Sequence, residues 1–136
     1  MARAKEFTVT IEDKPGALGR CFAALADKGV NVIAFQSFVE GRESLVRIVV
    51  NDPATAMSVL GGLRMIFEEG DVAVIRLNNR PGELGKATVR LGEKRINIDY
   101  SYSGIEPGSE KALAVFGVDS ITTASTALDE LEAERG

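Results

Sequence analysis

The sequence predicts an α+β fold made of two tandem copies of one β-α-β-β-α-β unit. The pattern Pro-Gly-x-Leu-Gly occurs at residues 15–19 and again at 81–85, and strand-like alternation precedes both occurrences. The same offset of 66 residues places Asn31 on Asn97 and Ser37 on Ser103. Repetition, alternation and helical spacing therefore indicate two copies of one structural unit.

Alternating apolar residues predict the strands. Phe7, Val9 and Ile11 alternate with polar residues, which is typical of a strand with one buried face. The strands expected in the first copy are residues 6–12, a second strand that begins at 30–34 and is closed by a polar turn at 40–43, then 45–50 and a short one at 65–67. The second copy repeats this order from Val72.

Two helices are predicted in each copy. Residues 17–28 carry apolar side chains at helical spacing, and Gly29 follows at the position where a C-terminal cap favours glycine. Asp52 followed by Pro53 has the form of an N-cap with proline in the first turn, so a second helix begins there. Its buried face is expected to carry Met57, Leu60 and Leu63.

This order of elements is that of a ferredoxin-like fold, a four-stranded antiparallel sheet with both helices on one face. We expect domain 1 at residues 1–69 and domain 2 at residues 70–136, with sheets packed side by side through their second strands and first helices. The last helix of the second copy, about residues 120–134, has no strand after it. The strand at 72–77 is therefore expected to have an open edge that pairs with another chain or with the N-terminal segment. The two copies differ by two inserted residues in a turn at 104–110.

The composition excludes several classes of protein. The chain has 136 residues and a formal charge of −4, which does not provide the positive field that nucleic-acid binding requires. It has no histidine and one cysteine, Cys21, so we expect no metal site, no intramolecular disulfide and a buried, unreactive thiol. No leader or membrane-spanning stretch is evident, which predicts a cytoplasmic protein without membrane contact.

Catalytic signals are weak. Without histidine, the usual general base for nucleophilic catalysis is missing. Residues 82–87 differ from a phosphate-binding P-loop in spacing and lack the Ser or Thr after the lysine. The third strands, which would carry exposed aromatic residues in an RNA-binding domain of this fold, are aliphatic. We expect a protein that is not an enzyme and has no cofactor.

A pair of motifs gives a specific resemblance. The strand-to-helix turn reads Asp-Lys-Pro-Gly-Ala-Leu at 13–18 and Asn-Arg-Pro-Gly-Glu-Leu at 79–84. Gly-Val-Asn-Val at 29–32 and Arg-Ile-Asn-Ile at 95–98 enter the second strands. Both pairs resemble the signature of the ACT domain, a small regulatory module that binds amino acids. The resemblance covers nearly the whole chain and implies a stand-alone pair of such domains.

The motif has a physical basis as a ligand site. Proline presets the first turn, and glycine lets a ligand approach the unpaired N–H groups of the opening helix, which suit a carboxylate. The resemblance implies a ligand between the turn of one repeat and the second strand of its neighbour. One site would pair the first turn with Asn97 and the other the second turn with Asn31. The implied ligand-binding residues are Asp13, Pro15, Gly16, Ala17, Leu18, Asn31, Val32, Asn79, Pro81, Gly82, Glu83, Leu84, Asn97 and Ile98.

Simpler interpretations stay open for some of these positions. Asp13 could only cap the helix that follows. Glu83 places a carboxylate in the first turn of its helix, where it could satisfy the helix dipole itself and leave one site per chain. Gly19 and Gly85 recur inside helices, which predicts that a neighbouring helix or loop packs closely against them and that they are interface residues.

The functional hypothesis is a non-catalytic regulatory protein that binds a free amino acid or a similar small zwitterion. Ligand binding would shift the population of one arrangement of the repeats and so control a partner. We expect a homodimer or a higher homo-oligomer. The alternative is an assembly or regulatory subunit of an amino-acid-metabolism enzyme, with little or no ligand binding of its own.

Overall fold

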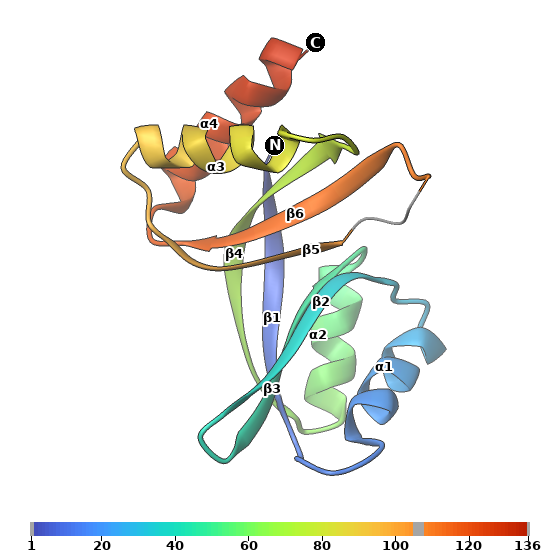
Figure 1. The fold of residues 1–136 in the computed structure, drawn as a ribbon. Coiled ribbons are helices and arrows are strands. Elements are labelled where there is room, and N and C mark those ends of the chain that lie inside the picture. The colour runs from blue at the N-terminus through green and yellow to red at the C-terminus, as the bar shows by residue number, and fades with distance from the viewer. Residues whose placement is uncertain (1, 105–107, 136) are drawn as a thin grey trace. The chain divides into compact units, whose positions relative to one another are not determined.

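The computed structural model describes residues 2–104 and 108–135, and it contains both predicted copies of the unit (Figure 1). The elements of the first copy are β1 (Arg3–Ile11), α1 (Ala17–Asp27), β2 (Val32–Glu40), β3 (Glu43–Val50) and α2 (Pro53–Gly62). They are followed by β4 (Ile66–Asn78), α3 (Glu83–Glu93), β5 (Ile98–Gly104), β6 (Lys111–Val118) and α4 (Ile121–Arg135). The central part of the turn expected at 104–110 lies outside the described residues.

The strands form one hydrogen-bonded sheet in the order β2-β3-β1-β4-β6-β5. The sequence predicted two sheets that join through their second strands, and this part of the prediction is wrong. The second strands, β2 and β5, are the two outer strands of the order, so within one chain they do not pair with each other. Each therefore has one edge without a partner strand in the described chain.

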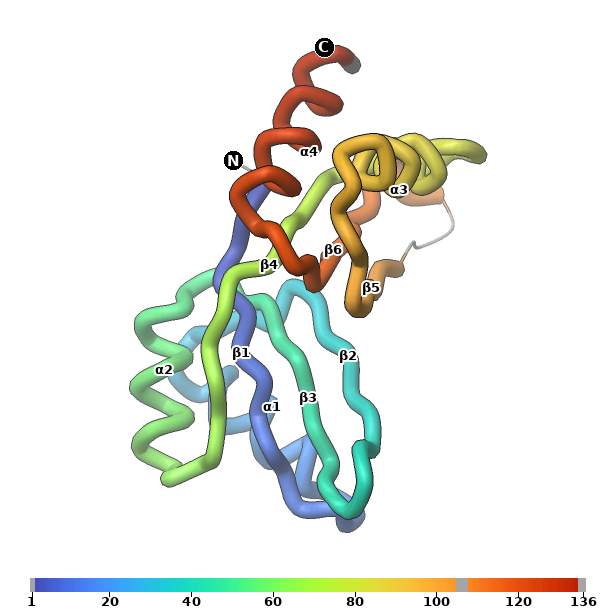
Figure 2. The backbone as a smooth tube through the Cα atoms, turned by 90° about the vertical axis from the view of Figure 1, so that its left-hand side faces the viewer, coloured from blue at the N-terminus to red at the C-terminus, as the bar shows by residue number. Residues whose placement is uncertain are grey.

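One compact unit comprises Lys5–Gly70. Its helices α1 and α2 cover the same face of its strands, as Figures 1 and 2 show. The side chains beneath them form one apolar core: Phe7, Val9, Cys21, Leu25, Val30, Val46, Ile48, Val50, Ala56 and Leu60. Cys21 is 2 % exposed, and burial raises the pKa of its thiol, as expected of an unreactive core residue.

The other unit combines Met1–Ala4 with Asp71–Gly136. Its core is formed by β4, β6, α3 and α4: Ala73, Ile75, Leu77, Ala87, Leu91, Ala114, Phe116, Ala124, Ala127, Leu128 and Leu131, with Ala2 and Ile96. The Ala2 carbonyl accepts a hydrogen bond from the Val74 N–H at 3.2 Å, and the Ala2 N–H donates to Asp129 Oδ1 at 2.7 Å. The N-terminal segment thus lies where the second copy lacks its own fourth strand.

The edge of the strand predicted at 72–77, now part of β4, is therefore not open. β4 has β1 on one side and β6 on the other, so it is not available to another chain, and the N-terminal segment is the partner. An assembly role that relied on this edge is therefore excluded.

β4 also differs from the short strand expected at 65–67. It runs without interruption over 13 residues, Ile66–Asn78, and supplies its first part to one unit and its second part to the other. Glu68, Glu69 and Asp71, in its middle, are exposed, and the extended backbone continues through them.

The buried face of α2 is narrower than expected. Ala56 and Leu60, one helical turn apart, are fully buried. Met57 and Leu63 are 41 % and 50 % exposed, so the prediction that they line the core is wrong. The start of α2 is as predicted, because the Asp52 side chain accepts a hydrogen bond from the Thr55 N–H at 3.1 Å. None of the described helices is both long and apolar enough to cross a bilayer.

Candidate functional site

The strand-to-helix turn of the first copy is built on a glycine. Gly16 precedes α1 with φ of +88°, and Gly82 precedes α3 with φ of +91°. Only glycine adopts this region without strain, which explains why the Pro-Gly pair recurs in both turns. Both helices then begin with N–H groups that have no partner within the helix.

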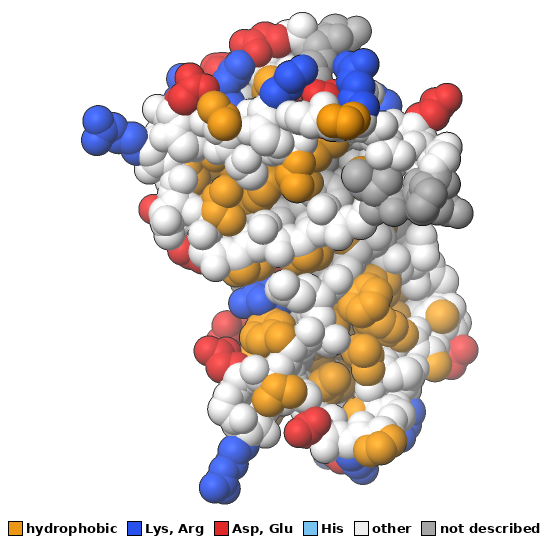
Figure 3. Space-filling model, in the orientation of Figure 1, with side chains coloured by type: hydrophobic (Ala, Val, Ile, Leu, Met, Phe, Trp, Pro, Cys, Tyr) orange, Lys and Arg blue, Asp and Glu red, His pale blue; other side chains and the backbone are white. Residues whose placement is uncertain are grey.

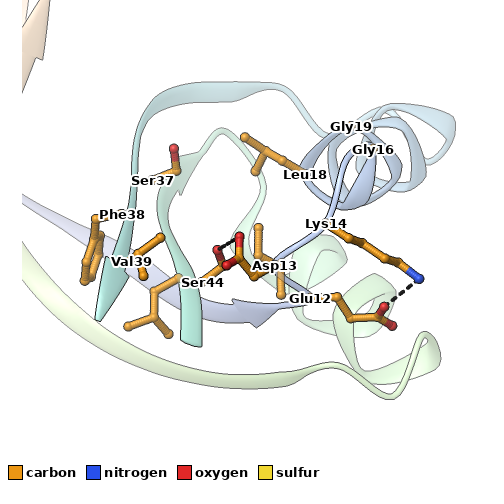
Figure 4. A pocket seen from close by; sticks show the side chains of 12 residues that line it. Glu12, Asp13, Lys14, Gly16, Leu18, Gly19, Ser37, Phe38, Val39 and Ser44 are labelled. Atoms are coloured by element: carbon orange, nitrogen blue, oxygen red, sulfur yellow. Dashed lines mark hydrogen bonds and ion pairs between the residues drawn. The ribbon is translucent and has the colours of Figure 1, made fainter. Parts of the chain in front are cut away.

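A pocket of about 340 Å³ lies beside the first turn (Figure 4). The turn and α1 contribute one side of it, and the β2–β3 hairpin contributes the other. Leu18 projects from α1 toward β2, and Asp13 points toward the hairpin, where the Ser44 hydroxyl donates to its carboxylate at 3.4 Å. The lining residues are Ile11, Glu12, Asp13, Lys14, Gly16, Leu18, Gly19, Ser37, Phe38, Val39, Ser44 and Leu45.

The charges around this pocket have both signs. Lys14 Nζ lies 2.6 Å from Glu12 Oε2, and this hydrogen bond and charge hold the pKa of the Glu12 carboxyl below its ordinary value. The guanidinium of Arg20 lies close to the turn, because a Cβ built on Gly16 would be 3.1 Å from Arg20 Nη1. The Ala17 N–H already donates to the Lys14 carbonyl at 3.3 Å. Carboxylates, cations and the N–H groups that follow it in the first turn of α1 can receive both ends of a zwitterion.

The second turn is arranged differently. The side-chain amide of Asn79 donates to the Ser109 carbonyl at 2.7 Å, which ties the turn to the segment before β6. Glu83 is 2 % exposed and lies 3.5 Å from Arg80 Nε and 3.3 Å from Lys86 Nζ. Burial raises the pKa of Glu83, but hydrogen bonds from Lys86 and Asn78 and the charges of Lys86 and Arg80 outweigh it, so the pKa lies below its ordinary value.

Glu83 therefore fills the start of its helix with its own carboxylate. The equivalent residue of the first copy, Ala17, is 8 % exposed. Ala17 lines a separate cavity of about 280 Å³ together with Arg20 and Cys21. The two turns have the same backbone conformation, but the polar side chains around them differ.

The two asparagines lie away from the turns. The Asn31 N–H donates to Asn51 Oδ1 at 2.8 Å, and the Asn97 N–H donates to Asp119 Oδ1 at 3.2 Å, so both are fixed at the starts of the second strands. From Asn31 to the pocket residue Phe38, the extended strand spans about 20 Å. Turn and asparagine are therefore not brought together within one unit.

Of the fourteen residues expected to bind ligand, Asp13, Gly16 and Leu18 line the pocket of the first turn. Pro15 and Pro81 are exposed beside their turns, Leu84 is exposed, and Val32 and Ile98 are half-buried at the starts of β2 and β5. Sequence reasoning missed the hairpin side, Ser37 to Val39 with Ser44 and Leu45. The recurrence of Ser37 at Ser103 was a signal that could have indicated it.

Two further expectations can be compared with the structure. A Cβ built on Gly19 or Gly85 would meet no atom within 4 Å, so no described residue of this chain packs closely against them, and their interpretation as interface residues stays a prediction. Within the same residues, no three His, Cys, Asp or Glu side chains are grouped to hold a metal ion.

Comparisons with known proteins agree with this architecture. A family model described as an ACT domain pair matches residues 2–131. The structure of protein BT0572 from Bacteroides thetaiotaomicron is similar, with a TM-score of 0.85 and 25 % identity over 96 % of this chain and 90 % of that one. No protein of curated function matches the sequence.

Regulatory subunits of aspartate kinase share the fold. The ligand-free subunit from Thermus thermophilus has a TM-score of 0.64 and 18 % identity over 95 % of this chain and 91 % of that chain. The subunit from Thermus flavus has a TM-score of 0.60 and 20 % identity over 96 % of this chain and 92 % of that chain.

Proposed function

We propose that this chain, which belongs to the family of ACT domain pairs, is a regulatory protein that binds a free amino acid at the first turn. The observation that carries the proposal is the pocket of about 340 Å³ at that turn, where Asp13 and the start of α1 face the β2–β3 hairpin. The ligand carboxylate would lie at the N–H groups that open α1, and its ammonium would face Asp13. The Arg20 guanidinium, whose Nη1 lies 3.1 Å from the position of a Cβ on Gly16, would be a second partner for the carboxylate.

A neighbouring copy completes the site in this proposal. The pocket lies at the end of β2, whereas the asparagines lie at the starts of β2 and β5, the outer strands of the sheet. If an outer strand pairs antiparallel with the outer strand of a second copy, the start of one strand lies beside the end of the other. The partner's asparagine then reaches the mouth of the pocket and offers both a donor and an acceptor.

The proposed regulation is a linkage effect. A ligand that contacts two copies stabilises their association and shifts the population of that arrangement by its difference in affinity. A partner protein that binds one arrangement better than the other is then regulated by the amino acid. No residue of the chain is assigned a catalytic role.

A thermal-shift screen against the twenty common amino acids and several 2-oxo acids tests this function. A ligand at 100 times its Kd adds about 2.7 kcal/mol to stability, which raises Tm by several degrees. The shift is expected for the wild type and for Asn79→Ala, whose side chain is tied to Ser109, and it is expected to be lost in Asp13→Ala. A flat screen, or an unchanged shift in Asp13→Ala, would contradict the proposal.

A second candidate is supported by the fold shared with aspartate kinase regulatory subunits. In this alternative the chain is a regulatory or assembly subunit of a separate enzyme of amino-acid metabolism and binds little ligand itself. It predicts a flat thermal-shift screen and a change in the activity of that enzyme when the purified chain is added. A selective shift lost in Asp13→Ala would exclude it.

A further inference from the structure

The first and second copies differ at the residue that opens the first helix of each. In the second copy this residue is Glu83, and both of its carboxylate oxygens are buried. Arg80 Nε lies 3.5 Å from Glu83 Oε1, and Lys86 Nζ lies 3.3 Å from Oε2. A buried carboxylate is stable only where opposite charges and hydrogen bonds replace its hydration. The second copy therefore contains an anion position, and its own side chain fills it.

The first copy keeps the cations of this position but not the carboxylate. The offset of 66 residues matches each of the three residues with a counterpart: Lys14 with Arg80, Arg20 with Lys86 and Ala17 with Glu83. The backbone is also the same, because Gly16 and Gly82 both have positive φ before their helices. The side chain of Ala17 ends at its Cβ, so it brings no carboxylate to the two cations.

A cavity of about 280 Å³ lies beside Ala17 in the first copy. Its walls carry Arg20 and a set of mainly apolar side chains: Ile11, Cys21, Ala24, Leu63 and Met65. At the position of Ala24 the second copy has Arg90, whose Nη2 lies 2.6 Å from Glu134 Oε2. Figure 3 shows charged side chains gathered over α3 and α4, whereas hydrophobic ones reach the surface in the region of α1 and β2. Ala17 and Ala24 are thus short at two positions where the second copy has long charged side chains.

Arg20 is the cation that a carboxylate in this cavity would meet. Its side chain is longer than that of Lys86, which reaches Glu83 from the corresponding position. Glu12 also lines the cavity, but its side chain is 71 % exposed and its carboxylate lies 2.6 Å from Lys14 Nζ. The charge of Glu12 is therefore already balanced by Lys14, and an added carboxylate forms its charged hydrogen bonds with Arg20.

From these observations we propose that the cavity beside Ala17 binds a short monocarboxylate with an apolar chain. The ligand carboxylate takes the place that the Glu83 carboxylate has in the second copy, and its chain contacts Leu63 and Met65. A volume of about 280 Å³ lies at the lower end of the range for ligand pockets, so the ligand is small. The site is separate from the pocket of the first turn, because the two spaces have only Ile11 and Glu12 in common among their lining residues.

A titration of the full chain, labelled with ¹³C at the methionine methyl groups, tests whether a carboxylate enters the cavity. Sodium pentanoate is expected to shift the signal of Met65, which lines the cavity, and to leave unchanged that of Met57, which does not. Shorter acids are expected to bind about fourfold more weakly for each methylene removed, because each buried methylene adds to the affinity. Pentanamide, which has the same shape without the charge, is expected to bind about tenfold more weakly.

Three variants test the position of the ligand. Ala17→Glu introduces the carboxylate of the second copy into the cavity, and it is expected to abolish pentanoate binding with unchanged circular dichroism. Ala23→Glu is the matched control, because it adds the same charge at an exposed position of α1 outside the cavity, and it is expected to bind pentanoate as the wild type does. Arg20→Gln leaves the cavity unfilled, so it is expected to weaken pentanoate binding about tenfold and to change pentanamide binding little.

Several results would overturn the cavity site. These are an unmoved Met65 signal, equal binding of pentanoate and pentanamide, or undiminished binding in Ala17→Glu. Norvaline, which is pentanoate with an ammonium group, is expected to leave the Met65 signal unchanged, because Glu12 is already paired with Lys14. A Met65 shift with norvaline as large as that with pentanoate would overturn the assignment to a simple carboxylate.

The cavity site and the proposed amino-acid site can fail separately. Arg20 borders both, so Asp13 and Ala17 are the residues that distinguish them. Pentanoate binding that Asp13→Ala abolishes and Ala17→Glu retains would place the carboxylate at the first turn, which overturns the cavity site and leaves the amino-acid site standing. A flat amino-acid screen, together with pentanoate binding that Ala17→Glu abolishes, overturns the proposed function and supports the cavity site.

Discussion

Glycine-to-alanine substitutions at four positions are expected to change stability with opposite signs. Gly16 and Gly82 have φ near +90°, where an L-residue loses about 1–2 kcal/mol. Alanine also lowers the entropy of the unfolded chain, which returns about 0.4–1 kcal/mol. The net expectation is a loss of about 1 kcal/mol in the free energy of unfolding for Gly16→Ala and for Gly82→Ala.

Gly19 and Gly85 are the matched controls three residues further along each chain segment. They lie in the first turns of α1 and α3, and a Cβ at either position meets open space. Alanine is better than glycine in a helix by about 0.5–1 kcal/mol, so Gly19→Ala and Gly85→Ala are expected to be stabilising. Gly16→Ala differs from Gly82→Ala only by a contact with the flexible end of Arg20, which can move at little cost.

Urea denaturation of the full chain, followed by circular dichroism, measures all four changes. The midpoints are expected to fall for Gly16→Ala and Gly82→Ala and to rise for the helix pair, with unchanged m-values. Four shifts of the same sign would refute the backbone argument. A lower midpoint for Gly19→Ala alone would show that another molecule packs against α1 at that position.

Three further substitutions test separate parts of the structure. Gly117→Ala is expected to cost about 1–3 kcal/mol, because its Cβ would lie 2.1 Å from the Tyr100 ring, and the cost should disappear in a Tyr100→Ala background. Asp129→Ala is expected to cost about 1–2 kcal/mol by removing the acceptor of the Ala2 N–H, and hydrogen exchange of the Val74 amide should become faster. Asp52→Ala is expected to lower stability at pH 7. Hydrogen bonds from the Thr55 side chain and N–H lower the pKa of Asp52, so its contribution is present above the ordinary carboxyl pKa and is lost as pH falls through the lowered one. A wild-type minus Asp52→Ala difference in stability that stayed constant from pH 7 to pH 2 would contradict this.

The repeated unit and its elements could be predicted from the sequence because their signals are local. Strand alternation, the Asp52–Pro53 helix start and the Pro-Gly turns depend on neighbouring residues, and all appear in the structure. The position of Cys21 in the core follows from helical spacing in the same way. The exposure of Met57 and Leu63 was missed because α2 buries a narrow stripe through Ala56 and Leu60, and apolar identity alone does not give that width.

The connection of the strands could not be predicted, because it depends on long-range pairing. The sequence left the second copy without a fourth strand, and it offered both the N-terminal segment and another chain as partners. The Ala2–Val74 hydrogen bond shows that the N-terminal segment is the partner of β4. This segment takes the place of the fourth strand that the first copy has and the second copy lacks. The hairpin side of the pocket, including Ser37 and Ser44, was missed for the same reason.

A titration of the ¹⁵N-labelled chain with the amino acid selected by the thermal-shift screen tests the central claim most directly. We expect the largest amide shift changes at Gly16, Leu18 and Gly19 and along Ser37–Val39, which together line the pocket. Changes confined to Val59, Gly62 and Leu63, in the apolar groove between α1 and α2, would place the ligand elsewhere and contradict the account.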